Sequence, residues 1–440
     1  MASTKVTESV LIYDTAIIGA GWAGLAAALI LAPEQKIVLI EAGRDAGGRA
    51  KSAQLLDDHL DAGQHLLIGA YQQTLQLLQS LGSHSDYQRL PLQLHLESTT
   101  APPLRLTPPK IAAPLHLLLA IMNAQGVSRR ERWRLIQGSL HLVNHRHSAK
   151  LTVAELLESL NQPQSLRQRF WSPLCLATLN TPIESASATL FSTVLKQSFS
   201  HSHRHSDLIL PQQNLTQLFV TPALYRLRQL RQHIMLSQRI ESIQPHHGTF
   251  LLQSHHRTIH ARELIIATAP WHLPPLLRYL PPLQPLGQQL AKWPVHAIAT
   301  LYLRYPPQIE LSYPFIGLLE GPAEWLFDRR FNGQRGVMAA VISHPTATTE
   351  RQRLLQQTLQ QLQHHFPHWP TPLKTTLVVE KRATWAATPE VEAERPNNRS
   401  AVERLWLAGD YTQGPYPATL EGAVRSGVET AQQILHNSGH

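Results

Sequence analysis

The segment DTAIIGAGWAGLAAALILAPEQKIVLIEA, residues 14–42, constrains the fold of this chain more than any other part. Its first residues read as a buried strand, and the Ala- and Leu-rich stretch that follows favours a helix. KIVLIEA then predicts a second strand, because a continuous apolar run is typical of strands that are buried on both faces. Strand, helix and strand occupy about thirty residues, which predicts a βαβ unit and a parallel sheet.

Three glycines mark the turn between the first strand and the helix. Gly19, Gly21 and Gly24 form a G-x-G-x-x-G pattern, and Glu41 ends the second strand 22 residues beyond Gly19. Such glycines let the backbone approach a pyrophosphate, and the helix N-terminus supplies unpaired N–H groups and a positive dipole end. A carboxylate at position 41 can hold both ribose hydroxyls and disfavours a 2′-phosphate. We therefore expect a dinucleotide to contact Gly19, Gly21, Trp22, Ala23, Gly24, Glu41 and Ala42.

Length and composition bound the rest of the chain. A chain of 440 residues is too long for one ordinary hydrophobic core, so two or three domains are expected. Hydrophobic residues make up 43% of the chain, which is enough to form the cores of these domains. The single cysteine, Cys175, excludes an internal disulfide and favours a cytoplasmic protein. MASTKVTESVLIYD at the N-terminus has no apolar core region, so no signal peptide is expected. No stretch reaches the roughly 18 apolar residues of a membrane-spanning helix.

The formal net charge of +9 raises the question of an anionic partner. Nucleic acid is not expected, because no basic stripe with interleaved aromatic residues is present. The apolar segment 111–122 is followed by basic residues in 128–134, which favours peripheral contact with the inner face of the cell membrane. A solvated charged helix face is the alternative. Histidine clusters at 201–207, 254–260 and 363–370 lack regular spacing, so no metal site is expected.

The distribution of patterns predicts an α/β fold with one discontinuous domain and one inserted domain. Strand and helix signals occur at both ends of the chain, and a Leu-, Gln- and Arg-rich region, residues 91–205, reads mainly as helix. The Pro-rich entry to this region reads as a crossover between domains. We predict a Rossmann-type dinucleotide domain from residues 1–95, 206–275 and 396–440. A mixed α+β substrate domain would take residues 96–205 and 276–395.

Motifs at both ends of the chain resemble the flavoenzyme superfamily of amine oxidases and carotenoid desaturases. They are AGRDAGGRA with Gly48 and Arg49, LIIATAP at 264–270, and LWLAGDYTQGPYPATLEGAVRSG at 405–427. The resemblance implies FAD as cofactor, with Arg49 at the pyrophosphate, Asp410 at the ribityl-phosphate region and the backbone of 421–423 facing the flavin ring. It extends the cofactor-binding set to Gly63, Gln64, His65, Ile240, Ala267, Asp410, Glu421, Gly422 and Ala423.

Three internal stretches are similar to one family of that superfamily, the bacterial hydroxysqualene dehydroxylases. They are DAGQHLLIGAY at 61–71, FWSPLCLATLNTP at 170–182 followed by ESASA, and SDLILPQ at 206–212. One departure is Ala62, where the family pattern has Asn. The resemblance implies that an allylic hydroxyl of a C30 isoprenoid alcohol is replaced by hydride from reduced FAD, giving squalene in hopanoid biosynthesis. It also implies a long, dry pocket that excludes nucleophiles.

The apolar stretch 170–182 is the predicted wall of that pocket. Aromatic faces stabilise cations, which favours Phe170, Trp171 and Tyr416 as pocket residues, with ordinary core packing as the alternative for each. Cys175 has no activating base nearby in sequence and reads as a small buried apolar residue of the same wall. The leaving hydroxyl needs a proton, for which the candidate acids are His65, Glu184 and Asp207.

Other functions remain open at the level of sequence. A carotenoid-type desaturase would run the flavin in the opposite direction on a similar hydrocarbon, and an amine oxidase would admit a polar amine. A non-catalytic prenyl-lipid carrier would not need the intact cofactor motifs. Since only one dinucleotide motif is present, we expect an external electron donor, and the enzymes that make the substrate are further candidate partners.

Overall fold

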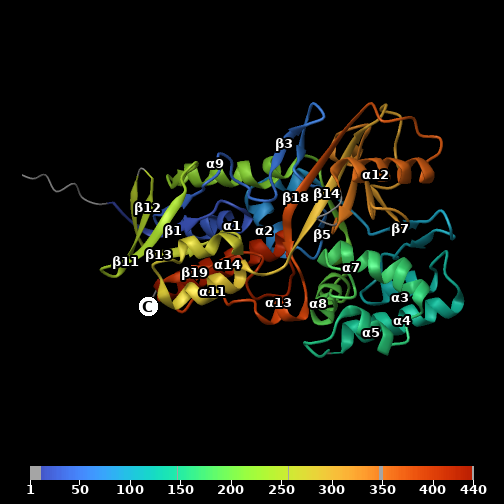
Figure 1. Cartoon of the computed structure of the whole chain (residues 1–440), viewed down its shortest axis with the longest axis horizontal. Coiled ribbons are helices and arrows are strands. Elements are labelled where there is room, and N and C mark those ends of the chain that lie inside the picture. The colour runs from blue at the N-terminus through green and yellow to red at the C-terminus, as the bar shows by residue number, and fades with distance from the viewer. Residues whose placement is uncertain (1–10, 146, 256, 346–349, 439–440) are drawn as a thin grey trace, which may run out of the picture.

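Two large β-sheets, one toward each end of the molecule, organise the chain (Figure 1). The computed structural model describes residues 11–145, 147–255, 257–345 and 350–438. Residues 1–10, which begin the stretch predicted not to be a signal peptide, and His256 of the second histidine cluster lie outside the described residues.

The first sheet has the strand order β10-β2-β1-β13-β12-β11, with β19 paired to β13. β1 (Ile12–Ile18) runs parallel to β2 (Ile37–Ile40) on one side and to β13 (Thr258–Ile266) on the other. β10 and β19 extend the parallel part, while β12 and β11 continue it as antiparallel strands. The βαβ unit predicted from residues 14–42 is present, and with it the α/β class. The remaining strands of this sheet are β10 (His233–Met235), β11 (Ile240–His246), β12 (Thr249–Ser254) and β19 (Leu405–Leu407).

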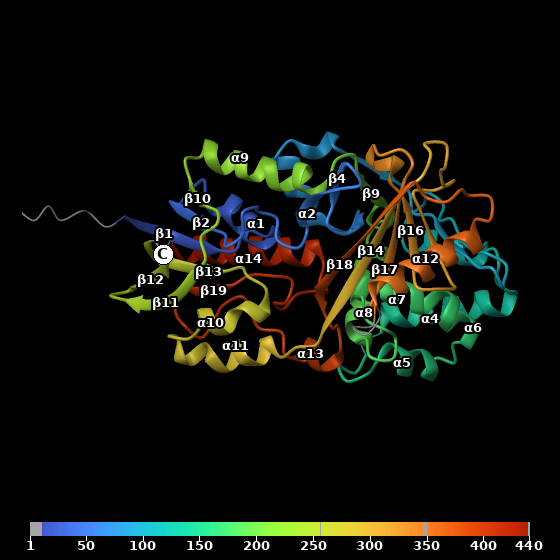
Figure 2. The same cartoon turned by 45° about the horizontal axis from the view of Figure 1, so that its top comes forward.

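Helix α1 (Trp22–Leu31) packs against α14 (Leu420–Ser438) beside this sheet, as Figures 1 and 2 both show. A Cβ at Gly427 would lie 2.1 Å from the Ala23 carbonyl oxygen, so only glycine lets the two helices approach this closely. α9 (Thr221–Gln229) also contacts α1. The close packing brings the last helix of the chain to the first.

The second sheet is mostly antiparallel and has the order β18-β14-β17-β16-β15-β7-β8. Its long central pair is β14 and β18, and β7 joins β15 in parallel. β7 and β8 therefore lie in the Pro-rich entry that the sequence predicted as a crossover between domains, and the helices of the region 91–205 begin at residue 115. The strands are β7 (Leu94–Glu97), β8 (Leu104–Leu106), β14 (Val295–Arg304), β15 (Phe315–Leu318), β16 (Trp325–Asp328), β17 (Val337–Ser343) and β18 (Lys374–Trp385).

Helices fill the chain between residues 115 and 199 and lie beside the second sheet (Figure 1). α4 and α5 each begin with a capping box, in which Ser128 pairs with Glu131 and Thr152 with Glu155. A π-helical turn at Arg167–Trp171 leads into α7. The helices are α3 (Leu115–Met122), α4 (Arg129–Asn144), α5 (Val153–Ser159), α6 (Gln164–Leu166), α7 (Ser172–Leu179) and α8 (Ala188–Phe199).

Shorter elements connect the two large sheets. β3 (Ser52–Leu55) and β4 (Asp58–Asp61) form a hairpin, and β9 pairs with both β5 and β6. α10 spans residue 275, where a domain boundary is predicted, and contacts β11 of the first sheet. The remaining elements are β5 (Leu67–Ile68), β6 (Tyr87–Leu90), β9 (Leu208–Pro211), α2 (Gln72–Ser80), α10 (Leu273–Leu276), α11 (Gln284–Ala291), α12 (Arg351–His365) and α13 (Pro389–Ala393). Among the described residues, no helix is long and apolar enough to cross a membrane.

Candidate active site

The glycine turn after β1 forms a cradle that is closed toward the protein and open on its other side. Gly19 has φ +107°, and a Cβ there would lie 2.6 Å from the Ala267 carbonyl oxygen. A Cβ at Gly24 would lie 1.9 Å from the Gly19 carbonyl oxygen. A Cβ at Gly21, by contrast, would meet nothing nearer than the Gly48 Cα at 3.9 Å. The open space beside Gly21 is where a pyrophosphate could reach the start of α1.

Glu41 stands at the end of β2, as the sequence predicts. One carboxylate oxygen accepts a hydrogen bond from the Ala20 amide at 2.8 Å and the other from the Gly43 amide at 2.7 Å. These bonds fix the carboxylate beside the glycine turn. Each carboxylate oxygen can accept more than one hydrogen bond, so acceptor positions remain for ribose hydroxyls.

Arg49 connects the Gly-rich loop to the C-terminal part of the chain. Its guanidinium pairs with the Asp410 carboxylate at 2.7 Å and donates to the Ala383 carbonyl at 2.7 Å. Gly47 and Gly48 both have positive φ, and Gly47 forms a parallel bridge with Gly21. The two residues that the superfamily resemblance assigns to the phosphates, Arg49 and Asp410, are therefore in direct contact.

The start of α14 has two backbone donors to offer. Gly422 donates its N–H to the Thr419 hydroxyl at 3.0 Å, and Ala423 donates to the Thr419 carbonyl at 3.1 Å. The amides of Leu420 and Glu421 have no acceptor among the described residues. Three residues are predicted to face the flavin through their backbone. The Glu421 amide has no acceptor among the described residues and is available to a ligand, whereas the amides of Gly422 and Ala423 donate within the helix cap.

The Glu421 side chain is fully buried, and its carboxylate caps the start of α2. Its carboxylate accepts from the amides of Gln73 and Thr74, both at 3.0 Å, and from the Thr74 hydroxyl at 2.8 Å. Burial raises the pKa of Glu421, opposed by these hydrogen bonds. Tyr416 adds a second link here, since its hydroxyl donates to the Ala70 carbonyl at 2.8 Å.

Residues 61–65, called the DAGQH loop below, lie against the second sheet and are held by a buried arginine. Arg329 is 1% exposed and donates to Gln64 Oε1 at 2.5 Å, and its second terminal nitrogen lies 3.9 Å from the Asp61 carboxylate. Tyr302 donates its hydroxyl to the Asp61 carbonyl at 2.9 Å. The Ala62 amide donates to the Lys51 carbonyl at 2.8 Å, which places this loop directly beside the Gly-Gly-Arg segment, residues 47–49.

His65 is the candidate acid that lies in this loop. Its Nδ1 is 2.8 Å from the Gly63 carbonyl oxygen, which can only accept, so Nδ1 carries a proton. Burial lowers the pKa of His65 against the opposing effect of the Asp61 carboxylate. The neutral ring leaves Nε2 as an acceptor that has no partner among the described residues.

The other two candidate acids lie elsewhere. Asp207 is buried before β9 and pairs with Arg89 at 3.4 Å. Glu184 is exposed to solvent. The structure therefore does not bring His65, Asp207 and Glu184 together through hydrogen bonds, and their catalytic roles stay predictions.

The stretch 170–182, predicted to be a pocket wall, buries Phe170, Trp171, Cys175 and Leu179 and leaves Ala177 exposed. Trp171 is 1% exposed and its indole donates to Gln162 Oε1 at 3.0 Å, while Phe170 packs edge-on against it. Cys175 is fully buried and its thiol donates to the Thr181 carbonyl at 3.3 Å. Burial raises the pKa of the Cys175 thiol, so a thiolate is strongly disfavoured.

Four further residues of the predicted cofactor-binding set are Trp22, Ala267, Ala42 and Ile240. The Trp22 side chain is buried and stacks on Phe219 with ring centroids 4.3 Å apart, so it supports α1 from inside. Ala267 follows β13 and donates its amide to the Ile18 carbonyl at 2.8 Å. Ala42 is exposed after β2, and Ile240 is buried at the start of β11.

Two buried arginines of this region carried no signal in the sequence. Arg329 reaches Gln64 across 265 positions of the chain. Arg395 donates to the carbonyls of Gly414 and Tyr416, both at 3.0 Å, and thereby shapes the turn that follows Asp410. Neither lies in a recognisable motif, so only the three-dimensional arrangement identifies them.

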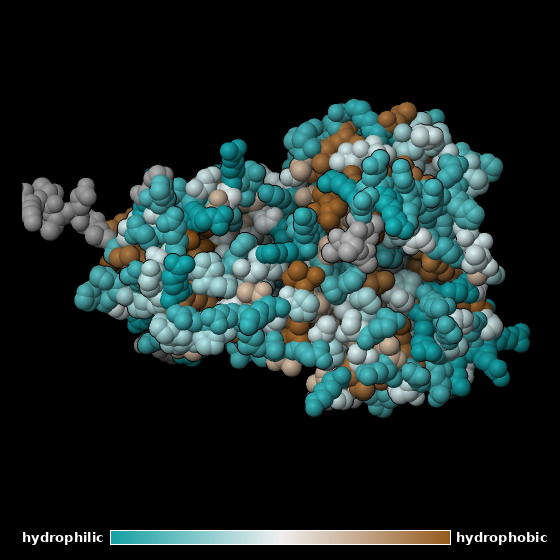
Figure 3. All heavy atoms as spheres, in the orientation of Figure 1, coloured by the Kyte–Doolittle hydropathy of each residue, from teal (hydrophilic) through white to brown (hydrophobic). Residues whose placement is uncertain are grey.

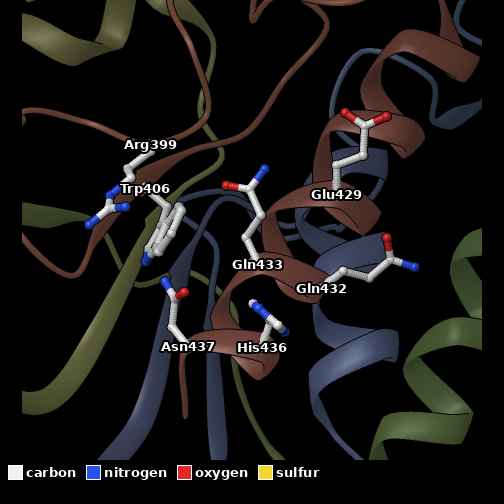
Figure 4. A pocket seen from close by; sticks show the side chains of 7 residues that line it. All are labelled: Arg399, Trp406, Glu429, Gln432, Gln433, His436 and Asn437. Atoms are coloured by element: carbon white, nitrogen blue, oxygen red, sulfur yellow. The ribbon is translucent and has the colours of Figure 1, made fainter. Parts of the chain in front are cut away.

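A surface pocket lies at the other end of α14 from the Glu421 amide. Figure 4 shows its lining side chains around Trp406 and the last turns of the helix. None of the predicted site residues belongs to it. The lining residues are Arg399, Trp406, Glu429, Gln432, Gln433, His436 and Asn437.

Comparison with known proteins defines the class to which this fold and cradle belong. A family model for flavin containing amine oxidoreductases matches residues 22–435. The chain belongs to this family and is an FAD-dependent oxidoreductase. The cradle fits that cofactor, because the open side at Gly21 and Gly48, the Glu41 carboxylate and Arg49 meet at one place. Bound there, FAD would lie along Gly19, Gly21, Gly24, Glu41, Gly48 and Arg49.

Within the family, the chain is similar over nearly its whole length to a hydroxysqualene dehydroxylase, as its internal motifs predict. The enzyme of that name from Zymomonas mobilis is 25% identical over 96% of this chain and 99% of its own length. The 15-cis-phytoene desaturase of Narcissus pseudonarcissus is 23% identical over 96% of this chain and 80% of its own length. Cyclohexylamine oxidase from Brevibacterium oxydans shares the fold, with a TM-score of 0.72, 17% identity and coverage of 98% of this chain and 100% of its own.

Proposed function

We propose that this oxidoreductase removes the hydroxyl group of hydroxysqualene and yields squalene. The end-to-end similarity to the Zymomonas dehydroxylase, which spans 99% of that enzyme, carries the proposal. The cyclohexylamine oxidase likeness supports the fold alone, at 17% identity. The apolar side chains of Phe170, Trp171, Cys175 and Leu179 are buried, and a pocket lined by them would suit a C30 hydrocarbon better than a small polar amine.

The proposed reaction is a reduction at carbon. The allylic C–O bond breaks, a C–H bond forms at the same carbon, and the hydroxyl group takes up a proton and leaves as water. Bound FAD in its reduced form supplies the hydride, and an external reductant restores it. The protein's own tasks are to exclude water, to hold the alcohol and to deliver the proton.

His65 is the best placed of the candidate acids for the proton transfer. It lies in the loop beside the Gly-Gly-Arg segment, and its Nε2 has no partner among the described residues. Asp207 is engaged by Arg89, and Glu184 faces solvent. Because burial lowers the pKa of His65, its protonated form is a stronger acid than an exposed imidazolium but is less populated, so Nε2 must take up a proton before each transfer. The rate of the proton-dependent step should then rise as the pH falls toward that pKa.

The sequence contains one Gly-rich dinucleotide motif, between Gly19 and Gly24, so the electron donor is proposed to be a separate protein. Purified protein mixed with NADPH alone tests this proposal. We expect no consumption of NADPH at a rate that supports turnover; rapid consumption would contradict a separate donor.

The reaction itself is tested by product labelling. Protein reduced with dithionite in D₂O is incubated anaerobically with hydroxysqualene, and the products are separated by mass. Because hydride on a reduced flavin exchanges with solvent, the proposal predicts squalene carrying one deuterium. Compared with the wild-type protein at equal FAD content, His65→Gln should lower the yield per unit time, while Glu184→Gln serves as the control for a candidate acid that faces solvent.

A desaturase function is the second candidate, since the similarity to the Narcissus phytoene desaturase also covers 96% of this chain. The same protein in its oxidised form is therefore offered phytoene. New conjugated double bonds in phytoene, together with unreacted hydroxysqualene in the reduced reaction, would replace the dehydroxylase proposal by the desaturase one.

A further inference from the structure

The outward face of α3 is apolar without interruption. Leu115, Leu119 and Met122 follow one another at helical spacing and are 54%, 37% and 50% exposed. Ile111, one turn before the helix, is also exposed. The one polar side chain of the helix, His116, is buried on the opposite face beside Ala120 and Ile121. A helix that is apolar all round is normally covered on every side, but this one is not.

Basic residues surround this apolar face. Lys110 precedes Ile111, and Arg129 and Arg130 are exposed at the start of α4, which packs against α3 (Figure 1). Arg132 donates to the Met122 carbonyl at 3.1 Å, which places it at the end of α3. Between residues 106 and 144 the sequence holds five basic residues and one acidic residue, Glu131, whose carboxylate is engaged in the α4 capping box.

On the face drawn in Figure 3, apolar side chains appear as small patches within a hydrophilic surface. Leu115, Leu119 and Met122 lie along one face of α3, and the exposed Ile111 precedes this helix. A row of this kind next to cationic side chains is the arrangement that inserts into the headgroup layer of an anionic bilayer.

We propose that Ile111, Leu115, Leu119 and Met122, together with Lys110, Arg129 and Arg130, form a docking surface for an anionic phospholipid bilayer. The apolar side chains enter the boundary between headgroups and acyl chains, and the basic side chains contact lipid phosphates. A second copy of the chain is disfavoured as the occupant, because a two-fold contact would place these cations against their own copies. The proposal stands independently of the reaction assigned above, since it rests on exposure and charge alone.

Vesicle co-sedimentation of the FAD-loaded protein tests the surface. The vesicles are phosphatidylglycerol in one arm and phosphatidylcholine in the other. We expect strong binding to the first at low salt, weaker binding to the second, and a decrease with added salt. Arg129→Ser/Arg130→Ser should reduce partitioning on the anionic vesicles by about thirtyfold, since each cation near such a surface contributes about 1 kcal/mol.

The contribution of the apolar residues of this surface is tested by the triple variant Leu115→Ser/Leu119→Ser/Met122→Ser. This variant should lower binding to both kinds of vesicle by at least about tenfold. Matched controls change exposed residues elsewhere: Tyr225→Ser/Leu373→Ser for apolar loss and Arg335→Ser/Arg353→Ser for charge. Unchanged thermal unfolding and FAD content verify that each variant is folded.

Three results would overturn the proposal. One is wild-type protein that binds neither kind of vesicle. Another is equal loss of binding in the control variants and in the α3 and α4 variants. The third is a wild-type oligomer that the α3 variant dissociates while vesicle binding stays unchanged, which would assign the face to a second copy of the chain.

Discussion

Gly21→Ala should separate FAD binding from folding. Gly21 has ordinary φ and ψ values of −74° and −179°, and an added Cβ would meet nothing nearer than 3.9 Å. The apoprotein should therefore keep its stability to within about 0.5 kcal/mol, or gain slightly from a less flexible unfolded chain. The same Cβ would occupy the open side of the cradle, where a pyrophosphate must approach the backbone, so FAD affinity should fall at least about tenfold, or 1.4 kcal/mol.

Two other glycines provide the comparison. Gly24→Ala should cost both stability and FAD, because its Cβ would lie 1.9 Å from a backbone oxygen. Gly82→Ala, at φ +80° in open space after α2, should cost about 1–2 kcal/mol of stability and leave FAD binding intact. Urea unfolding of the apoproteins and FAD titration followed by flavin fluorescence measure the two quantities. Wild-type FAD affinity in Gly21→Ala would refute the placement of the cofactor in this cradle.

Three further predictions concern buried groups. Arg329→Met removes the cation nearest the Asp61 carboxylate and should lower the free energy of unfolding by about 3 kcal/mol; a loss below about 1 kcal/mol in urea unfolding would show that the pair contributes little. Burial lowers the pKa of His95 to about 4, below its value in the unfolded chain, so its stabilising contribution is present at neutral pH and lost as the pH falls through about 6.5 toward 4. Between pH 7 and pH 5 the stability should drop by on the order of 1 kcal/mol through this residue, and His95→Gln should flatten the pH profile by that amount. Cys175, the only cysteine, should resist thiol reagents in the native protein and react once the chain is unfolded in urea; fast native labelling would contradict its burial.

The dinucleotide cradle could be predicted because its determinants are local. The βαβ unit, its glycines and Glu41 occupy residues 14–42, and hydrophobic periodicity together with glycine spacing identifies them. The position of Glu41 at the end of β2 follows from the same segment.

Contacts between distant segments could not be predicted in this way. The Pro-rich entry to the region 91–205 was predicted to be a crossover between domains, and the strands within it were not predicted: β7 is a strand because β15, more than 200 positions later, offers it a parallel partner. Arg329 and Gln64 meet through the packing of the second sheet on the DAGQH loop. Such pairs carry no pattern within either segment, since each residue alone is an ordinary polar side chain.

The sequence also could not predict the direction in which a side chain points within a correctly identified motif. Trp22 belongs to the G-x-G-x-x-G segment, yet its ring packs on Phe219 under the cradle. Glu421 belongs to the C-terminal motif, yet its carboxylate caps α2. In both cases the direction of the side chain depends on elements from elsewhere in the chain.

An anaerobic single-turnover reaction tests the central claim most directly. The FAD-loaded protein is reduced with dithionite, freed of excess reductant, and mixed with hydroxysqualene while the flavin absorbance is followed. The account predicts that oxidised-flavin absorbance returns and that one squalene forms per flavin. Persistence of the reduced flavin, with hydroxysqualene recovered unchanged, would contradict the assignment of this chain as a reductive dehydroxylase.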